Sequence, residues 1–287
     1  MSLTTLAPGS TLPRHRVSAR MPADVTENKI HEDGLARELG FRGGLVPGVT
    51  VYAWMTHPVV AALGVPWLER GTFRARFLSP VYFDEPVVIE AAVASLTGQG
   101  VTIEARAVNS AGELCATATF GLTEGASPAV PDLGNYPAAP LPDERPRVSR
   151  EVLAARPVLG TPELVLDAAT ARAFLDRVGE PLALYGGPAA AAHPGLYLHE
   201  ANRALSSNVI VSPWIHVESE GQHLGALRVG ERLETRARVG SLFERKGHQF
   251  VELDLLLLGE GKRPVAHIRH KAIYQLRNSG EAAREAR

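Results

Sequence analysis

The chain carries one pattern of residues twice, at an almost constant spacing. The repeat pairs residues 46–48 (VPG) with 193–195 (HPG), Trp67 with Trp214, and residues 84–87 (DEPV) with 230–233 (GERL). The first two pairs are 147 residues apart and the third pair is 146 residues apart. An offset shared by a helix start and several later segments predicts two copies of one fold within the chain.

Each copy contains an apolar helix followed by segments in which apolar and polar residues alternate. Alternation of this kind is typical of β-strands, and short turns between consecutive strands indicate antiparallel pairing. The expected strands of the first copy are residues 16–21, 71–81, 87–93, 101–108 and 114–122, and those of the second copy are residues 233–239, 249–258 and 265–276. We therefore expect an α+β fold with a mostly antiparallel sheet.

The stretch from Asn28 to Met55 has the most distinctive local pattern. It begins with Asn28-Lys29-Ile30-His31, continues with a short helix that ends before Gly40, and passes through residues 43–48 (GGLVPG). Glycine and proline at this density predict a turn in which the backbone passes close to its neighbours. Residues 49–63 are apolar on all sides, which predicts a buried helix, and Pro58 is expected to kink or split it.

The composition of the chain gives no support to several classes of function. The chain has 287 residues, a formal net charge of −1 and one cysteine, Cys115, which we expect to be buried and inert. This balance does not favour nucleic acid or a membrane surface as a partner, and an intramolecular disulfide is excluded. No metal-binding spacing, P-loop or G-x-G-x-x-G is present. With no signal-peptide pattern at residues 1–16, we expect a cytoplasmic protein without a metal.

The order N-x-I-H, short acidic helix, G-F-x-G-G-L-V-P-G and buried helix resembles the MaoC-like (R)-specific enoyl-CoA hydratase/dehydratase family in its double-hotdog form. The match covers Asn28, Ile30, His31, Gly44 and Gly48. The resemblance implies two tandem hotdog folds, each an antiparallel sheet wrapped round a central helix, which together form a pseudo-dimer.

The repeat and the composition also predict domain boundaries. A proline-rich linker over residues 127–150 separates the two expected copies. The N-terminal hotdog, residues 1–126, carries the hydratase-like motif, residues 151–278 form the second hotdog, and residues 279–287 are a polar tail. Exposed sheet edges make a homodimer of double-hotdog chains possible.

The resemblance also implies roles for individual residues. Hydration of an enoyl thioester needs a base, an acid and a donor for the carbonyl oxygen. His31 would be the base, the Gly48 N–H would be the donor, and Asn28 would orient water or hold the imidazole. The expected substrate-binding residues are Gly44, Val46, Pro47, Tyr52 and Thr56. The substrate would be an acyl-CoA or acyl-carrier thioester, with coenzyme A as part of the substrate and no other cofactor.

The sequence departs from the family at one catalytic position. Thr26 stands where the family has an aspartate, five residues before His31, and a hydroxyl does not act as an acid or base at neutral pH. Asp24 and Glu27 are the nearby carboxylates that could replace it.

The second copy has lost the motif, because Glu180 and Tyr185 keep the five-residue spacing but Tyr replaces His. Three functions therefore stay open: a hydratase or dehydratase with one active site in the N-terminal half, a hotdog thioesterase, or a non-catalytic acyl-thioester-binding protein.

Overall fold

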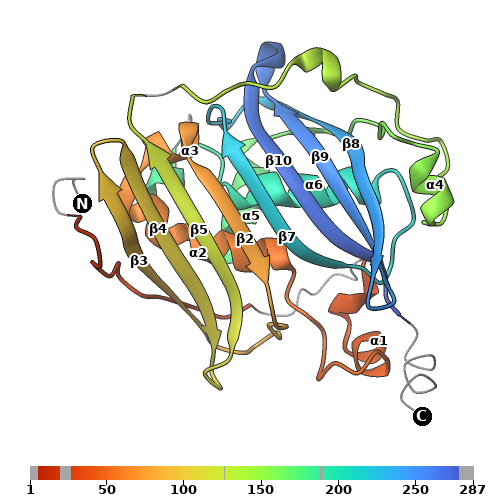
Figure 1. The fold of residues 1–287 in the computed structure, drawn as a ribbon, viewed down its shortest axis with the longest axis horizontal. Coiled ribbons are helices and arrows are strands. Elements are labelled where there is room, and N and C mark those ends of the chain that lie inside the picture. Colours follow the sequence, from red (N-terminus) through yellow and green to blue (C-terminus); the bar gives the residue numbers. More distant parts are fainter. Residues whose placement is uncertain (1–5, 20–26, 126, 188–189, 278–287) are drawn as a thin grey trace.

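A computed structural model describes residues 6–19, 27–125, 127–187 and 190–277. All its strands form one antiparallel sheet in the order β1-β3-β4-β5-β2-β7-β10-β9-β8-β6 (Figure 1). The strands are β1 (His15–Val17), β2 (Thr72–Phe77), β3 (Val87–Thr97), β4 (Gly100–Asn109), β5 (Leu114–Thr123), β6 (Glu163–Val165), β7 (Ile215–His223), β8 (Arg232–Arg245), β9 (His248–Leu258) and β10 (Pro264–Gln275).

The α-helices are α1 (Asp33–Glu38), α2 (Gly48–Leu63), α3 (Val65–Arg70), α4 (Arg150–Ala154), α5 (Ala168–Val178) and α6 (Gly195–Ser206). Short 3-10 helices are η2 (Lys29–His31), η3 (Leu133–Asn135), η4 (Ala183–Tyr185) and η5 (Glu260–Lys262). The predicted α+β class with a large antiparallel sheet is confirmed.

The two halves meet at the middle of the sheet. Strand β2 of the first half pairs with β7 of the second half, with Ala75 opposite Ser219 and Phe73 opposite Gly221. Gly221 is required there, because a Cβ at this position would lie 2.7 Å from a ring carbon of Phe73. The sheet therefore continues from one half into the other without an edge between them.

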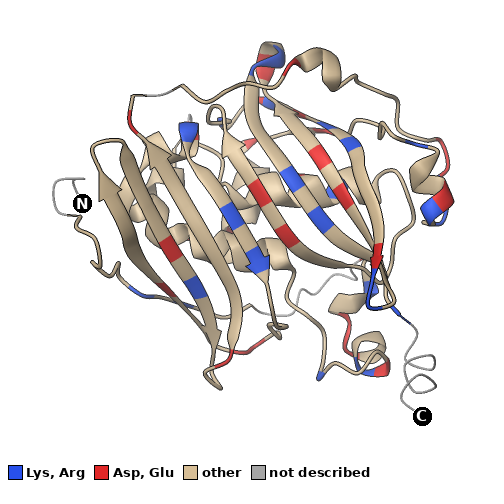
Figure 2. Cartoon of the chain, viewed as in Figure 1, with Lys and Arg blue, Asp and Glu red and all other residues tan. Residues whose placement is uncertain are grey.

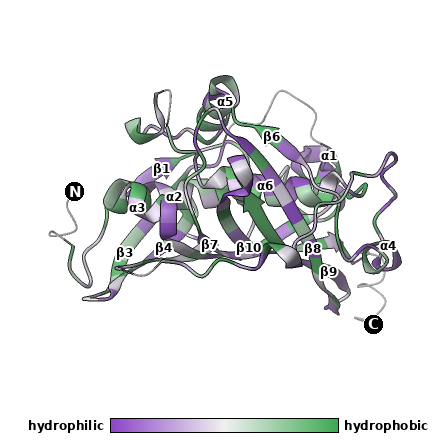
Figure 3. Cartoon of the chain, turned by 90° about the horizontal axis from the view of Figure 1, so that it is seen from above, coloured by the Kyte–Doolittle hydropathy of each residue, from purple (hydrophilic) through white to green (hydrophobic). Residues whose placement is uncertain are grey.

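Helices α2 and α6 lie side by side against one face of this sheet (Figures 1 and 3). Helix α2 buries nearly all of its side chains, as its apolar sequence predicts. Of the two outcomes expected for Pro58, a kink or a split, the split does not occur, since one helix runs from Gly48 to Leu63 with Pro58 buried inside it. Packing on all sides holds the helix together across the backbone hydrogen bond that proline removes.

The opposite face of the sheet carries paired charges (Figure 2). The carboxylate of Glu218 lies 2.7 Å from the Arg74 guanidinium, 3.6 Å from that of Arg76 and 3.5 Å from the Lys271 ammonium. Such cross-strand pairs are typical of a solvated sheet face. The arginines of the central strands are therefore partners of acidic residues in the same sheet.

Two segments differ from the simple alternation in the sequence. Strand β2 ends at Phe77, before Ser79-Pro80, rather than continuing to Val81. The first strand is short, His15–Val17, and residues 20 and 21 of the expected strand lie outside the described residues.

Within the proline-rich stretch, Tyr136 is only 4% exposed, and its hydroxyl donates to Asp254 of β9 at 2.9 Å.

Candidate active site

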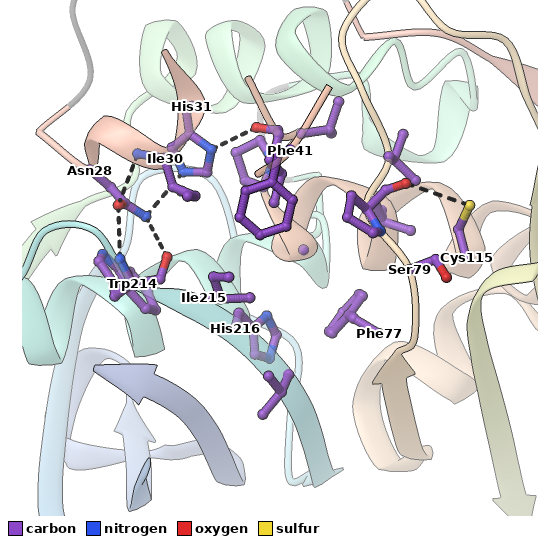
Figure 4. A pocket seen from close by; sticks show the side chains of 18 of the residues that line it. Asn28, Ile30, His31, Phe41, Phe77, Ser79, Cys115, Trp214, Ile215 and His216 are labelled. Carbon is purple, nitrogen blue, oxygen red and sulfur yellow. Dashed lines mark hydrogen bonds between the residues drawn. The ribbon is translucent and has the colours of Figure 1, made fainter. Parts of the chain in front are cut away.

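A cavity of about 240 Å³ opens between the two halves, beside the start of α2. Figure 4 shows it between His31 and Phe41 on one side and His216 and Phe77 on the other. Its lining from the first half includes Asn28, Ile30, His31, Phe41, Val46, Pro47, Gly48, Val51 and Phe77, and its lining from the second half includes Asn202, Trp214, Ile215 and His216. The predicted site residues of the N-terminal half therefore meet side chains that come from the second half.

His31 ends the 3-10 helix η2, which Asn28 caps by accepting a hydrogen bond from the Ile30 N–H. The Nδ1 atom of His31 lies 2.7 Å from the Leu45 carbonyl oxygen, which can only accept, so Nδ1 carries the proton. Burial lowers the pKa of His31 below its ordinary value, and the Leu45 carbonyl acts in the opposite direction. His31 is thus a neutral imidazole at pH 7 with its lone pair on Nε2.

Asn28 holds this imidazole and joins the two halves. Its Oδ1 accepts from the Trp214 N–H at 3.2 Å, and its Nδ2 donates to the Trp214 carbonyl at 3.0 Å. The same Nδ2 lies 3.3 Å from Nε2 of His31 and donates to it. Asn28 therefore orients His31, which is one of the two roles predicted for it.

The N-terminus of α2 supplies backbone donors to the cavity. Pro47 is the N-cap residue, and within the described part of the chain no side chain caps this helix end. The N–H groups of Thr50 and Val51 both donate to the Pro47 carbonyl, at 2.9 and 3.2 Å. The Gly48 N–H precedes them in the first turn, where helix geometry offers no intrahelical acceptor. This end of α2 can therefore bind an oxygen that carries partial negative charge.

Gly48 is also closely packed. A Cβ at this position would lie 3.1 Å from Nδ1 of His216 and 3.4 Å from the Phe77 ring. Glycine thus allows the helix start to approach two side chains of the cavity wall.

Of the five predicted substrate-binding residues, two line the cavity and three do not. Val46 and Pro47 line the cavity. The Gly44 N–H donates to Asp33 at 2.8 Å, and a Cβ at Gly44 would collide with the His31 carbonyl, so Gly44 supports the backbone under His31. Tyr52 and Thr56 face the core, where both are fully buried.

The structure does not bring a carboxylate to His31 among the residues that it describes. Glu27 is exposed, does not line the cavity, and lies 2.5 Å from Arg145. Asp24 and Thr26 lie outside the described residues. No Asp or Glu of the described ranges lines the cavity.

Several cavity residues escaped the sequence analysis. Three of them, His216, Ile215 and Asn202, belong to the second half of the chain. The fourth, Phe77, is the last residue of β2, and its sequence pattern indicated only a strand with alternating polar and apolar residues. The internal repeat pairs Trp67 with Trp214, which directly precedes β7. This pair was the only feature of the sequence analysis that lay close to His216. Cys115 also lines the cavity, and burial raises the pKa of its thiol to about 11, so it stays protonated and unreactive at neutral pH.

The equivalent position in the second half is filled. Helix η4 ends at Tyr185 as η2 ends at His31, and Tyr185 is buried. Beneath the start of α6, the Gly195 N–H donates to Nδ1 of His193 at 3.1 Å. The space that remains there among the described residues is about 10 Å³, which is too small for a ligand.

Glu180, five residues before Tyr185, lies in a buried polar cluster with His57 and His193 instead of a site. Its carboxylate lies 2.9 Å from His57 Nδ1 and 3.5 Å from His193 Nε2. Burial alone would raise the pKa of Glu180, but hydrogen bonds from His193, His57 and the Leu182 N–H lower it to about 2. The second half thus keeps a carboxylate at the position of Thr26 and uses it for internal pairing.

Neither a scan of protein-family models nor a search of curated protein sequences found a match to this chain. Several solved structures share its fold over almost their full length. A protein from Chloroflexus aurantiacus J-10-fl, described as a MaoC domain dehydratase, superposes with a TM-score of 0.69 at 12% identity, covering 97% of this chain and 98% of its own. A conserved hypothetical protein from Mycobacterium tuberculosis, described as a double hotdog fold, gives 0.66 at 15% identity, covering 95% and 98%.

A third structure, from Lactobacillus plantarum and described as an oleoyl thioesterase, gives a TM-score of 0.53 at 9% identity, covering 94% of this chain and 98% of its own. The chain therefore has the double hotdog fold, as the resemblance implied. Proteins described as dehydratases and as thioesterases share this fold, so the fold alone does not define the reaction.

The described residues contain no group of three or more His, Cys, Asp or Glu side chains placed to hold a metal ion. Among their helices, none is both long enough and apolar enough to cross a membrane.

Proposed function

We propose that the protein binds an acyl-CoA or acyl-carrier thioester in the cavity and adds water to its trans-2-enoyl group, or catalyses the reverse dehydration. One observation carries the proposal: Nε2 of a neutral His31 and the uncapped start of α2 at Gly48 belong to the same cavity. A base and a donor for the thioester oxygen are two of the three groups that this reaction needs.

The proposed reaction proceeds as a net addition of water. Nε2 of His31 exchanges its 3.3 Å hydrogen bond from the Asn28 amide for one from water. It then takes a proton from this water as the water oxygen attacks the β-carbon, and the electron pair of the double bond moves toward the thioester oxygen. The Gly48 N–H stabilises the negative charge that develops on that oxygen. The resulting imidazolium is stabilised by the hydrogen bond from its Nδ1 to Leu45. Returning the proton to the α-carbon completes the reaction and restores neutral His31.

In this scheme His31 serves as both base and acid. The scheme accounts for a cavity in which no described lining residue is a carboxylate. Asp24 remains a candidate for the acid, whereas Glu27 is engaged with Arg145 at the surface.

The size of the cavity supports a short acyl chain. It measures about 240 Å³, and its counterpart in the second half, at about 10 Å³, offers no extension. Tyr185 and Phe174 are among the side chains that line that second space. We propose a substrate whose acyl group has about four to six carbons, with the pantetheine arm leaving through the cavity mouth.

The lack of a described carboxylate in the cavity also supports a second candidate, a protein that binds acyl thioesters without turning them over. A thioesterase is the third candidate: on this scaffold His31 would direct water at the carbonyl carbon rather than the β-carbon, with release of free thiol.

The test is an assay with trans-2-butenoyl-CoA that follows the conjugated-enoyl absorbance and free thiol in parallel, with His31→Gln as the paired variant. Loss of absorbance without thiol, abolished in the variant, is the expected result. Thiol release that depends on His31 would identify a thioesterase. If both proteins bind butyryl-CoA, the saturated analogue, and neither changes trans-2-butenoyl-CoA, the second candidate, a non-catalytic acyl-thioester-binding protein, would be supported.

A further inference from the structure

His216 is a cavity residue to which the proposed reaction gives no role. It is the second residue of β7, is 6% exposed and lines the cavity that contains His31 (Figure 4). Its Nδ1 atom faces Gly48, because a Cβ on that glycine would lie 3.1 Å from it. Within the described ranges this buried nitrogen has no hydrogen-bond partner. A buried polar atom without a partner beside a ligand cavity indicates that a ligand supplies the partner.

The other nitrogen of His216 belongs to a short buried network. Nε2 lies 2.8 Å from Ser219 Oγ, and Ser219 Oγ lies 2.9 Å from Nδ1 of His270. Ser219 and His270 are paired residues on β7 and β10, and the two imidazole rings stack with centroids 4.1 Å apart. The network fixes the orientation of the His216 ring.

Both imidazoles in this network are neutral. Burial lowers the pKa of His270 to about 3. Burial and the neighbouring His270 lower the pKa of His216 well below 6.5, while a hydrogen bond with the Glu218 backbone acts in the opposite direction. Each ring therefore has one N–H, and Ser219 has one O–H. These three hydrogens can be arranged in two ways along the network.

In the first arrangement His270 donates to Ser219, Ser219 donates to Nε2 of His216, and the His216 proton is on Nδ1, next to Gly48. In the second arrangement every donor is reversed, which leaves the unpaired N–H on Nε2 of His270. That atom is also buried without a partner among the described residues, and His270 is 1% exposed and absent from the cavity lining. Each arrangement leaves one buried N–H without a protein partner, on Nδ1 of His216 in the first and on Nε2 of His270 in the second. A ligand in the cavity can pair with the first of these N–H groups but not with the second, because only His216 lines the cavity. The first arrangement is therefore favoured when a ligand with an acceptor oxygen is bound.

We propose that His216 is a second oxyanion donor, whose Nδ1–H binds the thioester carbonyl oxygen together with the Gly48 N–H. Ser219 and His270 are positioning residues that keep the proton on Nδ1. This inference rests on the proposed function, since it assigns the carbonyl oxygen of that substrate. Nδ1 is covered in this structure, so ligand binding displaces part of its cover, and the Phe77 ring, which packs 4.5 Å from His216 and is partly exposed, is placed to move.

The tautomer can be measured without any variant. A long-range ¹H–¹⁵N spectrum of the protein saturated with butyryl-CoA, with the protein labelled at histidine nitrogens, distinguishes a protonated Nδ1 from a protonated Nε2. We expect His216 to be protonated at Nδ1 alone, and Ser219→Ala to produce a mixture. A wild-type His216 protonated at Nε2 would overturn the proposal.

The contact with the carbonyl is tested with butyryl-CoA labelled with ¹³C at the thioester carbon, which binds without reacting. Binding to the wild type should move this resonance downfield, and His216→Phe should remove more than half of the shift and weaken binding about 10-fold. His248→Phe, at the start of β9 outside the cavity, is the matched control and should change neither.

The outcomes separate the two proposals. If butyryl-CoA binds and its carbonyl shift is the same in His216→Phe, the role of His216 is wrong while the proposed function stands. If the shift depends on His216 but no enoyl thioester is hydrated, His216 binds the carbonyl and the hydratase reaction falls. If the wild type binds no thioester, both proposals fall.

Discussion

Asn28 in the first half forms two hydrogen bonds with the backbone of Trp214 in the second half, at 3.0 and 3.2 Å. The same amide group donates to Nε2 of His31 at 3.3 Å. The orientation of the candidate base therefore depends on the interface between the halves. A single half of this chain would lack that support.

Replacing Asn28 with alanine should lower both stability and activity. It removes two hydrogen bonds to the Trp214 backbone, and we expect the free energy of unfolding to fall by about 1–3 kcal/mol. The hydration rate should fall by about 10- to 100-fold, because His31 loses its orienting contact. Urea denaturation and initial rates would measure the two effects.

The matched control for this variant is Lys29→Ala, which removes only a surface pair with Glu32 and should cost less than about 0.5 kcal/mol. Equal effects of the two substitutions would contradict the role given to Asn28.

Gly48→Ala should damage the site more than the fold. The added methyl group would lie 3.1 Å from Nδ1 of His216, so it displaces that ring or the bound carbonyl oxygen. We expect a loss of hydration of about 100-fold with a melting temperature that changes by only a few degrees. Gly34→Ala in α1, where a Cβ meets nothing within 4 Å, is the control and should be neutral or slightly stabilising. An active Gly48→Ala enzyme would exclude this helix start as the carbonyl site.

Stability should decrease as the pH falls below about 6.5. Burial lowers the pKa of His223 to about 4 and that of His270 to about 3, so both are neutral in the folded chain. As the pH falls below about 6.5, these histidines bind protons in the unfolded chain but not in the folded chain. The stability that is present above pH 6.5 is therefore lost as the pH falls toward the folded-state pKa values. Each of these two histidines should lower the free energy of unfolding at pH 5 by about 2 kcal/mol relative to its value above pH 6.5.

Urea denaturation at pH 7.5 and pH 5 tests this, with His223→Gln as the variant, because glutamine can still donate to the Trp67 carbonyl. The difference between the two pH values should shrink by about 2 kcal/mol in the variant. Glu180, whose pKa is lowered to about 2, acts only below pH 4.5 and does not interfere. An unchanged difference would show that His223 is not held neutral.

Substrate length should be limited by the closed second half. For trans-2-enoyl-CoA substrates, kcat/KM for the four-carbon chain should exceed that for the twelve-carbon chain by about 100-fold or more, since the filled space around Tyr185 and Phe174 offers the longer chain no extension. A series of even-numbered chains measured at one enzyme concentration would give the profile. Rates that rise with chain length would require a tunnel that this structure lacks in its described residues.

The fold was predictable because its signal is repeated and periodic. The offset between residues 46–48 and 193–195 places the starts of α2 and α6 correctly, and alternation locates most strands of both halves. Two local predictions needed correction. Pro58 does not split α2, because burial outweighs local propensity, and β2 ends at Phe77.

The site was only half predictable, because it is built across the two copies. Asn28, His31 and Gly48 lie in one sequence motif and meet in one cavity. His216 lies 168 residues beyond Gly48 in the sequence, and a lone histidine in a strand carries no signal of its own. Only the pairing of β2 with β7 brings it to the start of α2. Tyr52 and Thr56 belong to a helix buried on all sides, so sequence proximity to Gly48 could not decide which way they face.

The most direct test of the account is the initial rate of hydration of trans-2-butenoyl-CoA by the wild type and by His31→Gln, compared at equal folded fractions. We predict measurable hydration by the wild type and a loss of at least about 100-fold in the variant, with binding of butyryl-CoA retained by both. Equal rates in the two proteins, or no hydration by a wild type that binds the thioester, would contradict the claim that His31 catalyses this reaction.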